Sequence, residues 1–358
     1  MTRPDDRRAG ALIRRVAAVL ALSTAWLGAA PAIAEDQPAG TSQTRIARDI
    51  VAGLDKVFGG PHKGYRAAHS KGILLDGTFR PSKDATSLTR AEHLTEGDVA
   101  VTVRFSNFAG VPHVGDNTGD ANPKGMAIKF LLPDGGSTDI VAHSFDGFAA
   151  QTPDEFRRFV QALGSSDPQD FADHVAAHPA AKRFIEAPKP APVSFATEVF
   201  YGVNAFSFTN AAGESRFGKY RLVPVAGVAH LSAVEAAEKD PDYLSQDMAE
   251  RLEDGPVQFR LLVQLAGEGD PITQAAFPWP EDREQVELGV LSLTALAADS
   301  VARQRELVFT PLSLVGGIAP SDDPMLITRT RSYRMSYSRR LTAATDSHQP
   351  RHGKDAGK

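Results

Sequence analysis

Short segments in which apolar and polar residues alternate constrain the fold of this chain more than any other feature. In the clearest, residues 99–106, Val99, Val101, Val103 and Phe105 fall on one side, because strand side chains point alternately to two faces. Regular helices do not separate the expected strands, so we predict a mostly antiparallel sheet or barrel and not a doubly wound parallel sheet. The other strands are expected at 73–75, before a turn at 76–77, at 125–130, 139–143, 257–265 and 286–293, and around a turn at 211–214 within 195–225.

Helical patterns lie between the groups of strands. After Pro153, apolar residues recur three and four positions apart, as on one face of a helix. We predict an α+β fold in a single domain over residues 35–340, followed by a mostly polar, disordered tail at 341–358. Helices are expected at 35–60, from Pro153, at about 168–187, at the charged and surface-exposed 231–254, and from 321–324 to about 340.

Residues 1–34 have the pattern of a signal peptide. Arginines precede a mostly apolar run at 16–30, and Ala32-Ile33-Ala34 supplies small residues before acidic Glu35. The alternative is an uncleaved anchor, but the apolar run is short for a membrane span. We therefore expect cleavage near Ala34 and Glu35, a periplasmic or secreted protein, and no stable membrane anchor afterwards. Arg14-Arg15 leaves twin-arginine export open.

Charge and cysteine content exclude several classes of function. Without residues 1–34, which hold five Arg and two Asp, the formal net charge falls from −5 to −8. This balance argues against a nucleic-acid partner, because phosphate backbones need a basic face. The chain has no cysteine, which excludes disulfides, thiolate ligands, cysteine nucleophiles and covalent attachment of haem.

A pair on the last predicted helix could ligate a metal. Arg329 and Tyr333 are four residues apart and lie on one helical face. A positive charge beside a phenol favours the phenolate, and a phenolate can ligate ferric haem. The alternative is a surface cation beside a tyrosine. Tyr337 shares the face but lacks an arginine four residues before it, so it is the weaker candidate.

His69, Ser106 and His143 are candidate catalytic residues. Histidine exchanges a proton near neutral pH, and a serine can orient its ring. A histidine can also be structural, with its ring nitrogens satisfied by hydrogen bonds. Arg66 lies three residues before His69, and Arg104 shares a strand face with Ser106. Such arginines suit the anionic propionates of a haem.

Several segments resemble the haem catalase family, in the family's order and over roughly residues 60–340. Arg66–Gly72 resembles the segment around the distal histidine, and Val103–Ser106 resembles the strand that follows it. Arg329–Tyr333 is similar to the proximal Arg-x-x-x-Tyr motif. The other similar segments are Asn122–Phe130, Phe206–Glu214, Glu268–Asp270, Trp279–Pro280 and Gly317–Met325.

The resemblance implies a fold, a cofactor and residue roles. The fold would be a catalase-like antiparallel β-barrel with inserted and C-terminal helices. The cofactor would be a non-covalent haem b, with Tyr333 as axial ligand of the ferric iron and Arg329 keeping it ionised. His69 would be the distal acid and base, hydrogen-bonded to Ser106. Beside the haem would lie Arg66 and Arg104, at its propionates, and Phe148 and Phe156, against its ring.

The chain departs from full catalases in two ways. His143 stands where catalases have a distal asparagine, and the chain ends soon after the Tyr333 helix, without room for the later domains or the usual NADPH site. It therefore resembles the catalase-related peroxidases. That resemblance implies reduction of hydrogen peroxide or organic hydroperoxides by a small-molecule electron donor, with weak or no dismutation, because dismutation needs accurate distal positioning.

Three other readings stay open from the sequence. The protein could bind or sense haem without turnover, as the lost asparagine suggests. It could rearrange a hydroperoxide on the same fold. It could also be a β-barrel binding module without haem. A homo-oligomer is compatible with each of them.

Overall fold

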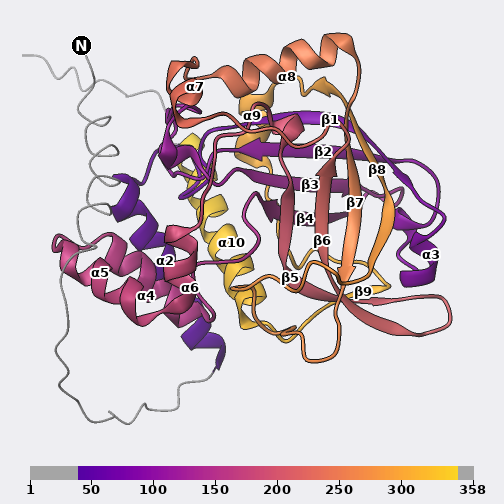
Figure 1. The fold of residues 1–358 in the computed structure, drawn as a ribbon, viewed down its shortest axis with the longest axis horizontal. Helices are drawn as coiled ribbons and strands as arrows, with labels where there is room; N and C mark the ends of the chain where they lie inside the picture. Colours follow the sequence, from indigo (N-terminus) through magenta and orange to yellow (C-terminus); the bar gives the residue numbers. More distant parts are fainter. Residues whose placement is uncertain (1–38, 346–358) are drawn as a thin grey trace, which may run out of the picture.

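The computed structural model describes residues 39–345. The predicted signal peptide and residues 346–358 of the predicted tail lie outside this range. Nine strands form one sheet (Figure 1). They are β1 (Gly72–Pro81), β2 (Val99–Ser106), β3 (Gly125–Leu131), β4 (Ser137–His143), β5 (Phe200–Thr209), β6 (Ser215–Pro224), β7 (Val257–Leu265), β8 (Gln285–Leu296) and β9 (Ile318–Pro320).

The sheet closes on itself as an antiparallel barrel. Its strands follow the order β4-β3-β2-β1-β8-β7-β6-β5, and every neighbouring pair is antiparallel. A further pairing between His143 of β4 and Tyr201 of β5 closes the ring. The short β9 adds to β5 outside it. The predicted antiparallel barrel is therefore confirmed.

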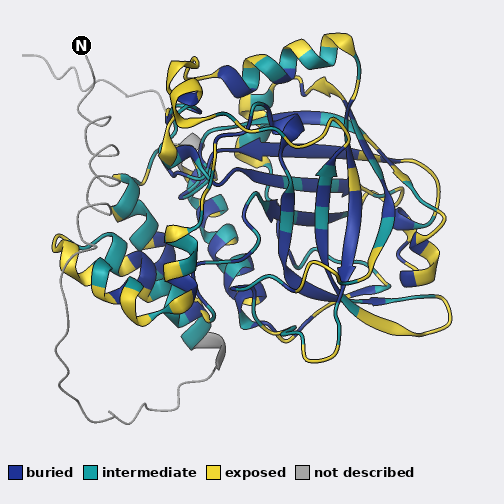
Figure 2. Ribbon diagram, viewed as in Figure 1, coloured by how far each residue is buried: buried dark blue, intermediate teal, exposed yellow. Residues whose placement is uncertain are grey.

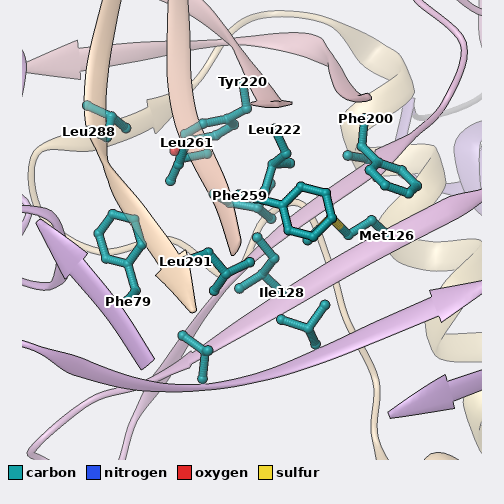
Figure 3. Close-up of a cluster of buried hydrophobic side chains, with 14 of the residues drawn as sticks. Phe79, Met126, Ile128, Phe200, Tyr220, Leu222, Phe259, Leu261, Leu288 and Leu291 are labelled. Atoms are coloured by element: carbon teal, nitrogen blue, oxygen red, sulfur yellow. The ribbon is translucent and has the colours of Figure 1, made fainter. Parts of the chain in front are cut away.

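Alternation along the strands fills the barrel with apolar side chains. Val101, Val103 and Phe105 of β2 belong to the buried core, while the residues between them face the other side of the sheet. Figure 3 shows this interior, where Met126 and Ile128 of β3 lie with aromatic and aliphatic residues of β5 to β8. The barrel therefore carries its own core, and the outer face of β2 is left for other contacts.

The predicted turn at 76–77 is wrong. Strand β1 runs through Asp76 and Gly77, and only its pairing with β8 shifts register there. A Cβ atom on Gly77 would lie 2.2 Å from the Ser292 carbonyl oxygen. Here glycine permits a close backbone approach at a bulge and does not mark a chain reversal.

Five of the helices lie together beside the barrel. Helices α2, α4, α5 and α6 make a layer at one side, and α10 lies between this layer and the barrel (Figure 1). No helix within residues 39–345 is both long and apolar enough to cross a membrane. The helices are α2 (Ala39–Phe58), α3 (Ala85–Leu88), α4 (Pro153–Leu163), α5 (Pro168–Ala177), α6 (Pro179–Glu186), α7 (Ala233–Glu238), α8 (Tyr243–Asp254), α9 (Ser300–Glu306) and α10 (Pro324–Thr345).

Three helix predictions need correction, and two helices were not predicted. The stretch at 168–187 forms α5 and α6, because Pro179 lacks the N–H that a continuous helix needs. The stretch at 231–254 is also two helices, and although α7 is largely exposed, α8 buries one face (Figure 2). Helices α3 and α9 were not predicted. Helix α10 continues to Thr345, so the first residues of the predicted tail are helical.

Candidate active site

A cavity of about 220 Å³ brings all nine predicted site residues together. It lies between the outer face of β2, β3 and β4 and the helices α2, α4 and α10. Most of its lining is apolar, including Ile50, Val51 and Leu54 of α2. The predicted residues in the lining are Arg66, His69, Arg104, Ser106, His143, Phe148, Phe156, Arg329 and Tyr333.

A row of paired residues across three strands forms one wall. Ser106 of β2 pairs with Gly125 of β3, which pairs with His143 of β4, so the three face the same side of the sheet. A Cβ atom on Gly125 would lie 2.7 Å from both His69 Nδ1 and Ser106 Oγ. The missing side chain at Gly125 therefore makes the space in which His69 reaches Ser106.

His69 is held rigidly beside this row. The ring atom Nδ1 lies 3.1 Å from Ser106 Oγ. The backbone N–H of His69 donates to the Phe108 carbonyl at 2.9 Å, and its backbone carbonyl accepts from Arg104 Nη2 at 2.8 Å. The Phe108 ring meets the imidazole edge-on at 5.6 Å. The backbone at His69 has a φ of 56°, a left-handed conformation that is costly for a histidine. These contacts hold it in that conformation.

Burial keeps both cavity histidines neutral. The pKa of His69 is lowered to about 3, first by burial and then by the charge of Arg104. The pKa of His143 is also lowered to about 3, by burial and by the charge of Arg329. An uncharged imidazole can accept a proton on one ring nitrogen while the other carries a hydrogen. Both rings are therefore suited to proton transfer or hydrogen bonding at neutral pH.

Helix α10 supplies the opposite part of the lining. Arg329 Nε donates to the Tyr333 hydroxyl at 3.1 Å, and Arg329 Nη1 donates to Asn204 Oδ1. Asn204 in turn donates to Asp323 at 2.7 Å. Hydrogen bonds to the Tyr333 oxygen and to Asn204 therefore hold the Arg329 guanidinium in place. Tyr337 does not line the cavity.

Three arginines give one end of the cavity an unbalanced positive charge. Arg66, Arg104 and Arg340 line it, and no carboxylate within residues 39–345 forms an ion pair with any of them. Burial and mutual repulsion lower the pKa of Arg104, to about 9, and of Arg66. The Leu307 carbonyl accepts from Arg66 and from Arg340, each at 2.9 Å. Buried charges of one sign call for an anionic ligand.

Arg340 was missed by the sequence predictions. It lies seven residues after Tyr333, two helical turns later on the same face, and that spacing could have identified it. The lining of the cavity thus has three parts: a phenol paired with an arginine, apolar and aromatic walls, and a positively charged end. It fits a flat apolar cofactor with anionic side chains and a metal that accepts an oxygen ligand.

Comparisons with known proteins identify the family of this chain. The family model described as Catalase matches residues 63–349. A catalase-related peroxidase of Mycolicibacterium paratuberculosis is 38% identical over 283 residues, which cover 78% of this chain and 90% of that protein. One of Synechococcus elongatus is 29% identical over 331 residues, covering 90% and 96%.

Solved catalase structures share the fold. Catalase A from Saccharomyces cerevisiae superposes with a TM-score of 0.68 at 22% identity, over 78% of this chain and 62% of that one. A fungal catalase gives a TM-score of 0.67 at 24% identity, over 80% and 61%. This chain therefore spans less than two thirds of these catalases, and at such identity the likeness concerns the fold alone.

Proposed function

Because this chain belongs to the catalase family, we propose that it is a haem peroxidase that reduces hydrogen peroxide or organic hydroperoxides with an external electron donor. Each hydroperoxide takes up two electrons and two protons and yields an alcohol and water, or two waters from hydrogen peroxide. The observation that carries the proposal is one cavity lined by two pairs, His69 with Ser106 and Arg329 with Tyr333.

The cofactor we propose is haem b, held without a covalent bond. Tyr333 would be the ligand of ferric iron, with its oxygen hydrogen-bonded to Arg329. Bound there, the haem would supply the redox chemistry of peroxide cleavage. The remaining contacts would be Arg66, Arg104 and Arg340 at the propionates and Phe148 and Phe156 against the ring.

His69 would move the proton during cleavage of the O–O bond. When Nδ1 donates to Ser106 Oγ, the lone pair of Nε2 is free to take the proton of the near peroxide oxygen. The same nitrogen then returns that proton to the leaving oxygen, which departs as water or alcohol. Burial supports this role, because the neutral imidazole is the form that can accept a proton.

Weak dismutation is the second part of the proposal. In dismutation a second peroxide must be oxidised, and its orientation depends on the distal groups. An imidazole at His143 has a different shape and donor position from the asparagine amide of full catalases.

The assay that tests this uses one haem-loaded sample for two rates, oxidation of an artificial electron donor and evolution of oxygen from hydrogen peroxide. We expect donor oxidation to dominate and His69→Ala to lower it by roughly 10²-fold or more. Dominant oxygen evolution would indicate a catalase. No peroxide consumption would indicate haem binding or sensing. A rearranged product without donor oxidation would indicate an enzyme that rearranges hydroperoxides.

We further propose that the protein acts in the periplasm or outside the cell, after removal of residues 1–34. Its partners would be the peroxide and a small-molecule donor, without nucleic acid or a stable membrane anchor. Sequencing the N-terminus of protein recovered from the producing cells tests this, with Glu35 as the expected first residue. A chain that begins with residues of the 1–34 segment would contradict it.

A further inference from the structure

The segment that carries His69 is hydrogen-bonded along its length to the connection between β2 and β3, residues 107–124. The His69 N–H donates to the Phe108 carbonyl at 2.9 Å, and the Asn107 N–H donates to the Lys71 carbonyl at 3.0 Å. The left-handed φ of 56° at His69 is costly and persists only where the surroundings hold it. The conformation of His69 therefore depends on where residues 107–124 are held.

Asp116 anchors this connection beside α8. Its side chain is buried, with 4% exposed. Oδ1 accepts from Asn107 Nδ2 at 2.7 Å and from Lys71 Nζ at 2.8 Å, and Oδ2 accepts from the Leu244 N–H at 3.1 Å. Lys124 Nζ donates to Asn107 Oδ1 at 2.9 Å, which leaves the amide donor of Asn107 turned toward Asp116. One carboxylate thus joins the strand connection, the His69 segment and the start of α8.

Lys71, two residues after His69, has a fully hydrogen-bonded ammonium group. Its Nζ lies 2.8 Å from Asp116 Oδ1 and 2.7 Å from Asp242 Oδ1, and it donates to the Pro241 carbonyl at 2.6 Å. An ammonium group has three hydrogens, so these three acceptors use all of them. Lys71 therefore ties the backbone just after His69 to the start of α8.

We propose that Asp116 and Lys71 are positioning residues, whose ion pair holds His69 at hydrogen-bonding distance from Ser106. This role rests on the proposed peroxidase function, in which His69 moves a proton. Neither Asp116 nor Lys71 lines the cavity, so both act on the peroxide only through His69. Without the ion pair, residues 107–124 lose an anchor, the backbone at His69 relaxes to a negative φ, and the imidazole leaves Ser106.

Kinetics test whether the charge of Lys71 is used. Lys71→Met removes the charge and keeps most of the length of the side chain, whereas Lys71→Arg keeps a cation. We expect Lys71→Met to lower the second-order rate constant of haem-loaded protein for hydrogen peroxide by roughly ten- to hundredfold, and Lys71→Arg to recover most of that loss. The double variant with Asp116→Ala should lose no more than Asp116→Ala alone, because the two residues act as one pair.

Asp270→Ala is the matched control. Asp270 is buried to a similar degree, with 6% of its side chain exposed, and it accepts from Arg283 and from the Gly267 N–H. It does not line the cavity. We expect Asp270→Ala to lower the free energy of unfolding and to leave the rate constant for hydrogen peroxide unchanged, which separates positioning from a general loss of stability.

The position of the His69 ring can be measured without turnover. The protein would be labelled with ¹⁵N-histidine and loaded with zinc protoporphyrin, which is diamagnetic, and His69→Gln would identify the His69 signals by their absence. Burial lowers the pKa of His69 to about 3, so the ring in wild type and in Asp270→Ala should stay neutral from pH 8 to pH 5. In Lys71→Met we expect the ring to gain a proton within this range, because it has moved toward solvent.

The outcomes separate this inference from the function on which it rests. If wild-type protein does not react with peroxide, the proposed function fails, and the ring measurement still decides whether Lys71 positions His69. If wild type reacts, equal rate losses in Lys71→Met and Lys71→Arg indicate a packing role and overturn the proposal. An unchanged rate in Lys71→Met, or a slower variant whose His69 ring stays neutral down to pH 5, also overturns it. If Asp116→Ala does not fold, the two Lys71 variants decide.

Discussion

At the scale of single residues, the site depends on one unusual backbone conformation and on one missing side chain. His69 has a left-handed φ, and Gly125 leaves the space that its ring occupies. Buried histidines elsewhere, such as His93 in the barrel core, have a lowered pKa as well but no access to the cavity. Burial alone therefore does not mark a catalytic histidine. A catalytic histidine is identified by its position relative to Ser106 and the cavity.

Gly125→Ala should displace His69 without touching the cofactor residues. The added Cβ would lie 2.7 Å from His69 Nδ1 and from Ser106 Oγ, so the ring must move. We expect kcat/KM for peroxide to fall by roughly 10²-fold, as for misplacement of a catalytic group by about 1 Å, with haem content retained. Gly316→Ala is the control, because no atom lies near its added Cβ. An unchanged kcat/KM in Gly125→Ala would contradict the assigned geometry.

Tyr333→Phe should remove the axial ligand that we propose. We expect loss of the tyrosinate-to-iron bands in the resonance Raman spectrum and at least a tenfold loss of haem affinity, or about 1.4 kcal/mol. Tyr337→Phe is the control on the same helix, since Tyr337 does not line the cavity and phenylalanine keeps its ring over Arg340. If the bands persist in Tyr333→Phe, another residue ligates the iron.

At the scale of elements, β2 serves the core and the site at once. Its alternation sends Val103 and Phe105 inward and Arg104 and Ser106 outward. The sequence predicted this division because a period of two in apolar residues is a local property. The end of α10 was harder to predict, since the five residues that continue it, Leu341–Thr345, are too few to show a periodic apolar face. Helix α9 was missed because a short, charged and exposed helix has no apolar periodicity.

Arg340→Gln should separate cofactor binding from folding. Arg340 is one of three unbalanced cations at the cavity, and glutamine keeps a donor for the Leu307 carbonyl. We expect roughly tenfold weaker haem binding, whereas the free energy of unfolding of the haem-free protein should not fall, because a buried like charge is removed. Arg334→Gln, at an exposed position of the same helix, controls for loss of charge. Unchanged haem titrations would exclude Arg340 from the site.

At the scale of the whole molecule, the barrel core and the site are separate. The core fills the barrel, while the cavity lies outside its wall and is lined also by residues of the helical layer. The strands, and the side chains of each strand that face the core, could be predicted from local patterns. The family motifs identified nine cavity residues. The closure of β4 on β5 and the position of α10 between two layers arise from contacts between segments far apart in sequence. No local pattern contains them.

Because the core and the site are separate, a substitution in the core should change the free energy of unfolding at acid pH without altering the site. Burial lowers the pKa of His93 to about 4, so between pH 6.5 and pH 4 the unfolded chain binds more protons at this residue than the native protein. The free energy of unfolding must therefore fall as pH falls through that window. From pH 7.5 to pH 4.5 the contribution of His93 should be about 2 kcal/mol.

Urea unfolding of haem-free wild type and His93→Leu at both pH values measures this contribution. Leucine cannot titrate and leaves no unpartnered Nδ1 in the core, so the variant should lose about 2 kcal/mol less than wild type on acidification. Comparing the two proteins is necessary because buried carboxyl groups such as Asp139 and Asp146 have a raised pKa and act in the opposite direction. Those groups are common to both proteins and cancel in the difference. If both proteins lost the same free energy, His93 would be as protonated in the native core as in the unfolded chain, which would contradict its lowered pKa.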